Sequence, residues 1–489
     1  MASIEELKQA RIAKIEKLKK AGMDPYPATI LRDYSISEVK TSFADLASKS
    51  ETNPISIAGR VMIVRGQGAI LFIVLQDGKD RLQAVLKKDV LSADSFSLFV
   101  DTVDNGDFIS VTGSLFVTDR GEQSILIKDW KMGAKALLPL PDKWGGLQDV
   151  EERFRKRYLD FITTPELQDI FIKKARFWEV TREFMNSHGF LEVETPTLEV
   201  TTGGAEARPF ETHHNDFDID VYLRISVGEL WQKRLMAAGF PKTFEIGRVY
   251  RNEGSSPEHL QEFTNMEFYG AYISLSEGKK LVRDMFISIA EKVFGTTQFN
   301  TRGYSFDLSE EWQEIDYVDE IKKTTGIDIF ENSEEDMMNK LHELGVTYEG
   351  KNKERLTDSL WKFCRKKIAG PTFLINHPKL VAPLSKTHPL DSRKTDMFQV
   401  LIAGSELGRG HAELNDPIDQ KERFEMQQKL IEKGDDEAMM ADMEYVEMME
   451  HGMPPTFGFG FGERLFAFMV DKPIRETQLF PLMKPKDEK

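Results

Sequence analysis

Hydrophobic and polar residues alternate along five short stretches near the start of the chain. The stretches are ISIAGRVMIV, AILFIVLQD, RLQAVL, DFISVTGSLFVTD and QSILIKDW, all within residues 55–135. Turn signals separate them, among them Gly66/Gly68, Asp77-Gly78 and Arg120-Gly121. Alternation with a period of two is typical of strands that bury one face. Five such strands at this spacing predict a small β-barrel of the OB type over residues 51–138.

A helical pattern precedes this barrel, within residues 1–50. Residues 4–21 place five apolar side chains on one helical face, namely Ile4, Leu7, Ile12, Ile15 and Leu18. The first twenty residues also contain six basic residues against three acidic ones. Such a helix either packs only on its own domain or also contacts a nucleic acid, and the pattern leaves both open.

The chain after the barrel predicts a linker and a larger mixed domain. Residues 136–150, ALLPLPDKWGGLQDV, carry prolines and a Gly-Gly turn, so a linker is expected over 139–160. Helical and strand patterns then mix over 161–489, which predicts an α+β domain. Within it, residues 305–370 predict a helical insertion. Residues 417–450, rich in Asp, Glu, Met and Lys, predict one long solvated helix.

The segment from Phe244 to Tyr269, FEIGRVYRNEGSSPEHLQEFTNMEFY, predicts an antiparallel hairpin with a long tip. Arg251 and Glu253 fall at its mouth, and Phe263 lies on the returning arm. A guanidinium neutralises phosphate, a carboxylate accepts from a base amino group, and an aromatic ring stacks on a base. The hairpin is therefore a candidate nucleotide site, although a surface hairpin with an ion pair would explain Arg251 and Glu253 alone.

Two further segments have distinctive patterns. Residues 189–196, GFLEVETP, join a predicted helix to a strand that ends in proline, which cannot donate a hydrogen bond within a sheet. Residues 454–466, PPTFGFGFGERLF, alternate glycine with phenylalanine and predict a strand with one bare face, followed by a helix that begins near Arg464. A bare face lets a flat ligand lie against the backbone, but tight packing between strands would also explain the glycines.

Composition narrows the class of protein. The 489 residues are 40% hydrophobic and 30% charged, which is typical of globular proteins with two or three domains. The sequence contains no run of about eighteen apolar residues, so no membrane association is expected. The single cysteine, Cys364, excludes an internal disulfide framework and predicts a cytoplasmic location. A net charge of −16 argues against broad coating of nucleic acid but allows a local basic face.

These segments resemble the three motifs of class II aminoacyl-tRNA synthetases, most closely those of the lysyl type. Residues 189–196 resemble motif 1, the hairpin resembles motif 2, and residues 454–466 resemble motif 3. The resemblance extends from LPLPDKWGGLQD in the linker to FPLMKP near the end of the sequence. It implies an anticodon-binding OB domain, an antiparallel catalytic sheet flanked by helices, and a homodimer built through motif 1.

The resemblance assigns an ATP site residue by residue. It implies that Arg251 holds the α-phosphate together with the attacking carboxylate. Arg464 would meet the distal phosphates, so Arg251 and Arg464 are the expected catalytic residues. Glu253 and Phe263 would seat the adenine, and His259 would approach the distal phosphates.

The resemblance also implies Mg²⁺ as the cofactor that accompanies ATP, because the clustered phosphate charge needs more than two arginines. The family's position for a magnesium carboxylate falls on Glu406. Its usual companion carboxylate is Gln399 in this chain, so the resemblance implies a weakened or rearranged second metal position.

The implied amino acid is L-lysine. Recognition of its side chain requires burial of an ammonium group, which is costly unless carboxylates and hydrogen bonds compensate. The positions that line the lysine pocket fall on Gly204, Glu229, Glu267, Tyr269, Arg409, His411 and Glu413. The resemblance gives Gly204 and Glu229 to the α-amino end, and Glu267, Tyr269 and Glu413 to the ε-ammonium end.

Arg409 and His411 depart from the family's pattern. They stand where the family usually has an amide and an aromatic ring. Arg409 could hold the α-carboxylate of the amino acid, or it could crowd the site or repel a cationic substrate. His411 is expected to form a wall of the pocket rather than to carry a proton.

On the barrel, the resemblance places Arg65, Phe72 and Gln83 on the face that reads the anticodon of tRNA(Lys). Barrels of this type bind single-stranded nucleic acid through aromatic platforms and nearby basic groups. From the barrel pattern alone, Phe72 fits the core better than such a platform.

The implied reaction has two steps: lysine and ATP form lysyl-adenylate and pyrophosphate, and the lysyl group then passes to the terminal ribose of tRNA(Lys). Because the lysine carboxylate itself attacks, alignment and electrostatics would carry catalysis. The first alternative is an aspartyl or asparaginyl synthetase of the same layout, whose substrates would favour Arg or Lys where this chain has glutamates. A catalytically altered paralogue that binds tRNA or protein is the second, and a ligase that lysylates a protein is the third.

Overall fold

A computed structural model describes most of the chain. The described ranges are residues 3–66, 68–141, 147–205, 207–254, 256–348, 350–432 and 439–486. The chain divides into two compact units, Met1–Asp169 with Phe480–Lys489, and Ile170–Leu479. Of the predicted linker, residues 142–146 lie outside the described ranges. The part that follows forms α5 (Val150–Arg155) and α6 (Arg157–Thr163) in the first unit. The predicted domain limits remain predictions.

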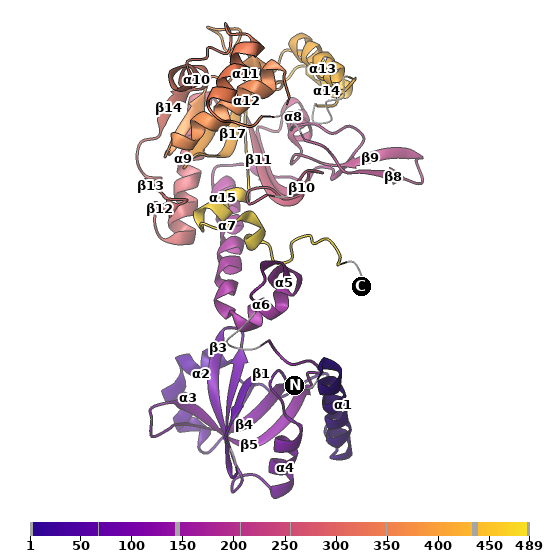
Figure 1. The fold of residues 1–489 in the computed structure, drawn as a ribbon, viewed down its shortest axis with the longest axis vertical. Coiled ribbons are helices and arrows are strands. Elements are labelled where there is room, and N and C mark those ends of the chain that lie inside the picture. Colours follow the sequence, from indigo (N-terminus) through magenta and orange to yellow (C-terminus); the bar gives the residue numbers. More distant parts are fainter. Residues whose placement is uncertain are drawn as a thin grey trace. The chain divides into compact units, whose positions relative to one another are not determined.

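The first unit is built on a closed barrel (Figure 1). Its strands are β1 (Ile55–Arg65), β2 (Ile70–Asp77), β3 (Asp80–Lys87), β4 (Phe108–Val117) and β5 (Gln123–Ala134), in the order β1-β2-β3-β5-β4. Alternate side chains point inward, so Leu71, Ile73 and Leu75 of β2 are buried in one core. The predicted OB-type barrel is confirmed. The helices α2 (Ile36–Thr41), α3 (Phe43–Ser50) and α4 (Ala93–Thr102) also belong to this unit.

The predicted N-terminal helix is confirmed as α1 (Ile4–Lys20). Its Leu18 is fully buried in the barrel core. Lys14 and Lys17 form ion pairs of 2.6 and 3.1 Å with aspartates of the same unit. Arg11 donates to the backbone carbonyls of residues 136 and 138. The helix therefore packs on its own domain and uses much of its basic charge there.

The second unit contains an eight-stranded sheet. The strand order is β14-β15-β16-β17-β18-β11-β10-β6, and neighbours are antiparallel except for the pairs β14–β15 and β10–β6. The strands are β6 (Leu191–Glu192), β10 (Lys242–Tyr250), β11 (Glu262–Ala271), β14 (Gln313–Asp316), β15 (Thr372–Ile375), β16 (Met397–Ile402), β17 (Ser405–Ala412) and β18 (Thr456–Gly462). The predicted antiparallel sheet with flanking helices is confirmed.

Helices bury one face of this sheet and leave the other for a site. Phe177 of α7 (Gln168–Ser187) and Phe286 of α9 (Leu275–Ile289) share a core with Phe268 of β11. Successive residues of a strand face opposite sides. The residues of β11 at odd positions therefore face away from this core.

The remaining elements surround the sheet. They are α8 (Glu229–Ala237), α15 (Arg464–Met469), the strands β7 (Leu198–Glu199), β8 (Glu211–His214) and β9 (Ile219–Leu223), and the hairpin β12 (Gln298–Thr301) and β13 (Tyr304–Asp307). Among the described residues, no helix combines the length and the apolar character needed to cross a membrane.

The predicted helical insertion contains α10 (Tyr317–Thr325), α11 (Glu334–Glu343) and α12 (Lys353–Cys364), which appear together in Figure 1. These helices bury a core of their own that includes Trp361. The range 305–370 is not wholly an insertion, because β14 within it forms the edge of the main sheet.

The prediction of one long solvated helix over 417–450 is wrong. The described residues there form two helices, α13 (Pro417–Glu432) and α14 (Met443–Glu450). Asp442, within the acidic run, accepts a hydrogen bond from the backbone of Tyr445 and so caps the start of α14. Phe424 and Tyr445 are fully buried, so these helices have an apolar face that the polar composition of the segment did not indicate.

Candidate active site

The predicted hairpin is confirmed by β10 and β11, which pair antiparallel and run side by side in Figure 1. Val249 lies opposite Phe263, close to the loop at the tip of the hairpin. Arg251 follows β10 directly, and its guanidinium donates to the backbone carbonyl of Ile225 at 3.3 Å. The carbon at the centre of this guanidinium lies 5.4 Å from the centroid of the Phe263 ring. The hairpin thus brings a cation and an aromatic ring to one place.

A cavity of about 360 Å³ lies between this hairpin and the strands beside it. Its lining includes almost every residue of the sequence-predicted site, namely Gly204, Glu229, Arg251, Glu253, His259, Phe263, Glu267, Tyr269, Glu406, Arg409, His411 and Arg464. Glu413 is not part of the lining. It is 1% exposed and lies behind His411. The volume is within the range usual for small-ligand sites.

The glycines of β18 make room for side chains of both neighbouring strands. A Cβ atom at Gly458 would overlap the Glu413 carboxylate and the Tyr269 ring. At Gly460 it would lie 2.8 Å from Cγ of Glu267. The same glycines line the cavity, so the bare strand face serves both tight packing and the pocket wall.

A β-bulge in β17 aims two charged residues into the same cavity. Gln399 of β16 pairs with Arg409, but Leu401 pairs with Glu406, so β17 has one extra residue between these pairs. Without the bulge, residues 406 and 409 would face opposite sides of the sheet. With it, Glu406 and Arg409 both line the cavity.

Glu267 is a buried carboxylate at one end of the cavity. It accepts hydrogen bonds from the Val227 backbone at 2.9 Å, from Asn265 Nδ2 at 2.9 Å and from the Tyr269 hydroxyl at 3.0 Å. Burial, and then the nearby Glu229 carboxylate, raise the pKa of Glu267 to about 7. Among the described residues, no basic side chain forms an ion pair with it.

Lys233 is a buried cation that the sequence analysis missed. Its ammonium lies 2.6 Å from Glu229 Oε1 and 2.5 Å from Glu413 Oε2, and its side chain is fully buried. Burial acts to lower the pKa of Lys233, but the two carboxylates raise it above its usual range. The spacing of Glu229 and Lys233 on α8, four residues apart, was the available signal.

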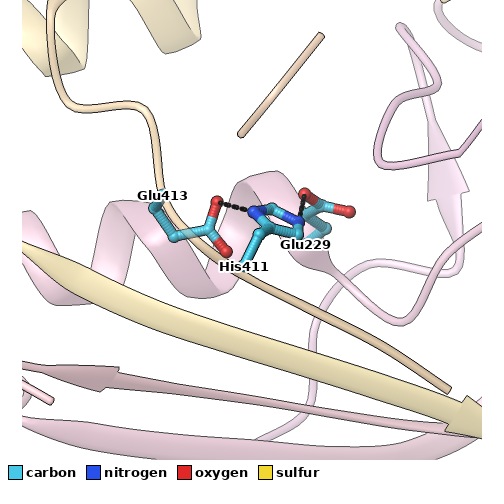
Figure 2. Close-up of side chains that lie close together, drawn as sticks. All are labelled: Glu229, His411 and Glu413. Carbon is cyan, nitrogen blue, oxygen red and sulfur yellow. Dashed lines mark ion pairs between the residues drawn. The ribbon is translucent and has the colours of Figure 1, made fainter. Parts of the chain in front are cut away.

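Figure 2 shows His411 between Glu229 and Glu413. Its Nδ1 lies 3.3 Å from Glu413 Oε2, and its Nε2 lies 3.9 Å from Glu229 Oε1. Two carboxylates and an imidazole are ligand types that hold metals such as zinc. The same carboxylate oxygens already contact the Lys233 ammonium, whose charge would repel a metal ion. These groups therefore do not fit a metal centre; Glu229 and His411 line the pocket instead, and Glu413 lies behind them.

Gly204 closes this end of the cavity. Its φ of +87° is a conformation that other residues rarely adopt. A Cβ atom there would overlap Ser226 and Glu229. Glycine is therefore required for the chain to approach Glu229 so closely.

The opposite end of the cavity is rich in arginine. Arg464, the first residue of α15, lies 3.6 Å from Glu258 and donates to the backbone carbonyl of Glu406. The Glu406 carboxylate accepts from Trp361 Nε1 at 2.6 Å and lies 3.2 Å from Arg365. Burial acts to raise the pKa of Glu406, but Arg365 and the Trp361 hydrogen bond hold it below its usual value. This end suits a polyanion.

His259 stands beside the arginines. Its Nδ1 lies 2.7 Å from the Ser256 hydroxyl. Burial and the nearby Arg464 charge lower the pKa of His259, which favours a neutral imidazole.

The donors near Glu406 fit a magnesium ion that arrives with phosphates. Mg²⁺ usually takes one or two protein carboxylates together with substrate oxygens. Glu406 offers a carboxylate, whereas Gln399 offers an amide oxygen that lies 3.0 Å from His377 Nε2. The residues present therefore fit a metal shared with a ligand and do not form a cage for a metal held by the protein alone.

The predicted anticodon residues lie on the barrel of the first unit. Arg65 pairs with Phe72, and Val74 pairs with Gln83, so the three predicted side chains share one face of β1, β2 and β3. Phe72 is 38% exposed between the buried Leu71 and Ile73, so it is not a core residue. Gln83 donates to the Ser124 hydroxyl at 2.9 Å. The role of this face remains a prediction.

Comparison with known proteins identifies the family. Residues 149–484 match the family model of class II tRNA synthetases (D, K and N), and residues 55–132 match the OB-fold nucleic acid binding domain. A lysine–tRNA ligase of Thermotoga sp. (strain RQ2) is 41% identical over 487 residues, which cover 99% of this chain and 97% of that protein. The chain belongs to the lysine–tRNA ligases of class II.

Other relatives show the same extent of similarity. A lysine–tRNA ligase of Thermosipho africanus is 40% identical over 486 residues, covering 99% of this chain and 97% of that protein. One of Listeria welshimeri is 40% identical over 486 residues, covering 98% and 97%. The resemblance found in the motifs is thus a full-length relationship, and this synthetase has the barrel and catalytic sheet that the motifs predicted.

Proposed function

We propose that this synthetase activates L-lysine with ATP and transfers the lysyl group to tRNA(Lys). ATP would lie along Arg251, Glu253, His259, Phe263 and Arg464. The amino acid would lie in the pocket formed by Gly204, Glu229, Glu267, Tyr269, Arg409 and His411, with Glu413 acting from behind the wall. Arg65, Phe72 and Gln83 would contact the anticodon.

The main support for lysine as the substrate is the buried carboxylate of Glu267. Lys233 neutralises Glu229 and Glu413, but no described basic residue pairs with Glu267. The Arg251 charge acts on Glu267 without an ion-pair contact. A buried carboxylate without a cation in contact is costly, and an ammonium group in the cavity would offset that cost. An aspartate or asparagine side chain would not supply this charge, so the aspartyl and asparaginyl alternatives fit less well.

Catalysis in the proposed reaction follows from alignment. Arg251 would contact both the substrate carboxylate and the α-phosphate, so its interaction strengthens as charge develops between them. Arg464 would hold the distal phosphates at the other end of the cavity. Mg²⁺ would neutralise phosphate charge, and Glu406 is the residue proposed to meet it.

The proposed partners are tRNA(Lys), ATP and L-lysine, and the proposed assembly is a homodimer. Three apolar residues in or near the motif 1 segment support an interface, because Leu191, Leu198 and Val200 are 51%, 50% and 65% exposed. A cytoplasmic location is proposed on the basis of the single cysteine.

Amino-acid-dependent ATP–pyrophosphate exchange tests the proposal. We expect exchange with lysine alone among the twenty amino acids, without tRNA, and lysine transfer when tRNA(Lys) is added. Exchange with aspartate or asparagine, and not with lysine, would favour an aspartyl or asparaginyl synthetase. Binding of tRNA without any exchange would favour the non-catalytic paralogue, and transfer to a protein but not to tRNA would favour the protein ligase.

A further inference from the structure

Arg409 is a guanidinium on the cavity wall that has no contact partner in the part of the chain that the structure describes. It lines the cavity, and among the described residues none forms a hydrogen bond or ion pair with its side chain. This is unusual beside Arg464 and Arg251, whose guanidinium groups both contact backbone carbonyls. The Arg409 side chain is exposed, and its charge acts on the Glu406 carboxylate without an ion-pair contact, so the guanidinium is available to a bound anion.

The strand register places Arg409 between the two ends of the cavity. It pairs with Gly460, and Gly460 pairs in turn with Glu267, the proposed ammonium partner. The backbones of Arg409 and Glu267 are therefore two strand spacings apart, about 10 Å. Along β17, Arg409 is three residues from Glu406 at the phosphate end. This intermediate position is where the carboxylate of an amino acid would meet the α-phosphate of ATP.

Several positive charges lie around the same cavity, which supports the binding of an anion there. Burial lowers the pKa of Arg251, the Glu253 and Glu267 carboxylates act to raise it, and the positive charges of Arg464 and Arg409 act to lower it. Arg464 lies 3.6 Å from Glu258, whereas Arg409 has no counterion in contact among the described residues, so an anion bound between Arg251 and Arg409 would relieve the repulsion between these two charges.

The same wall offers few ligands for a second metal ion. The residue beside Arg409 on β16 is Gln399, an amide whose oxygen lies 3.0 Å from His377 Nε2. The Glu406 carboxylate contacts Trp361 and Arg365. The wall thus carries a permanent cation where a pair of carboxylates would be needed to hold a divalent ion.

We propose that Arg409 is a further catalytic guanidinium for the adenylation step, which acts on the α-phosphate together with Arg251 and in place of a second protein-held divalent cation. The inference rests on the proposed function. A lysine carboxylate oxygen attacks the α-phosphorus and forms the new O–P bond. The bond from that phosphorus to the α,β-bridging oxygen breaks, and pyrophosphate leaves with the electron pair. No proton moves, and the negative charge that develops on the α-phosphate oxygens is stabilised by Arg251 and Arg409.

Substitution of Arg409 tests the catalytic role. For Arg409→Gln we expect lysine-dependent exchange to fall about 100-fold in kcat, the usual cost of removing one transition-state donor. The Kd for lysine, measured by calorimetry, should stay within about threefold, since the group acts mainly in the transition state. Arg409→Lys should recover part of kcat, because it restores the charge without the planar fork. The matched control is Arg393→Gln, at an exposed arginine paired with Asp391.

Exchange within about threefold of the wild type in Arg409→Gln would overturn the role. So would a variant that loses only lysine affinity and keeps kcat, since Arg409 would then hold only the ground state. A wild type without lysine-dependent exchange would instead refute the proposed function.

The number of metal ions bound per active site tests whether Arg409 replaces a second divalent cation, and this measurement does not depend on turnover. Mn²⁺ replaces Mg²⁺ as the probe, and α,β-methylene-ATP replaces ATP because it cannot be cleaved at the α-phosphate. We expect one Mn²⁺ per active site by electron paramagnetic resonance titration, brought by the nucleotide. Two or more ions per site in the wild type would show that this wall holds a divalent cation and would overturn the inference.

Discussion

Lysine binding should depend on pH through Glu267, and the Glu267→Gln variant should remove that dependence. The carboxylate is buried, and its pKa is raised to about 7. Only the ionised carboxylate pairs with an ammonium group, so lowering the pH through 7 removes the binding form. About nine-tenths of the carboxylate is ionised at pH 8 and about one-tenth at pH 6, for a pKa near 7.

The expected change in the Kd for lysine follows from these ionised fractions. The Kd for lysine should rise about tenfold from pH 8 to pH 6, which corresponds to about 1.4 kcal/mol. At pH 8, Glu267→Gln should weaken binding by about 2–5 kcal/mol, or about 30-fold or more, because the ammonium would be buried without its charged partner. The variant should then bind lysine with little change across the same range.

Isothermal titration calorimetry with L-lysine at pH 6, 7 and 8, at constant ionic strength, measures these values. Glu262→Gln is the matched control, because Glu262 lies on the same strand with its side chain 53% exposed. His259 is unchanged in Glu267→Gln, so any pH dependence of Kd that remains in that variant has a source other than Glu267. A wild-type Kd that changes less than twofold between pH 6 and pH 8, or an equal slope in both proteins, would refute the reasoning.

Two further predictions follow from buried charge and from the barrel face. Lys233→Met should lower the free energy of unfolding by about 3–5 kcal/mol, since it leaves Glu229 and Glu413 buried without a cation. Thermal unfolding measures this loss, Lys233→Met/Glu413→Gln should recover part of it, and an unchanged melting temperature would contradict it. Phe72→Ala should weaken tRNA charging by about 1–3 kcal/mol, the cost of one lost base-stacking contact, and leave lysine-dependent exchange unchanged. Equal losses in charging and exchange would show that Phe72 supports folding instead.

Patterns within single strands predicted much of the fold. The barrel strands and the hairpin β10–β11 depend on alternation over a few residues, which is visible in the sequence. The side on which Phe72 lies was not decided by composition, and only the barrel geometry shows that it points outward. The division of 417–450 into two helices was missed because Asp442 looked like one more acidic residue rather than a helix cap.

The candidate site was predicted mainly through the motifs, and the missed parts depend on contacts between distant elements. Lys233 joins Glu229 on its own helix to Glu413 near the end of β17, and only the first of these contacts has a local spacing. The bulge that turns Glu406 toward the cavity involves no distinctive residue besides Gly408. Such features arise from strand pairing, which a pattern along one segment does not specify.

The returning strand of the hairpin, β11, fixes the distance between the two ends of the substrate cavity. Phe263, Asn265, Glu267 and Tyr269 face the cavity in that order, at every second residue of β11. Six residues of an extended strand span about 20 Å, so the distance from the nucleotide end to the ammonium end is set by backbone geometry. Inserting or deleting one residue between Phe263 and Glu267 would not change this distance gradually. It would turn Glu267 and Tyr269 to the core side, so a change of amino-acid choice in this fold has to come from substitution at fixed length.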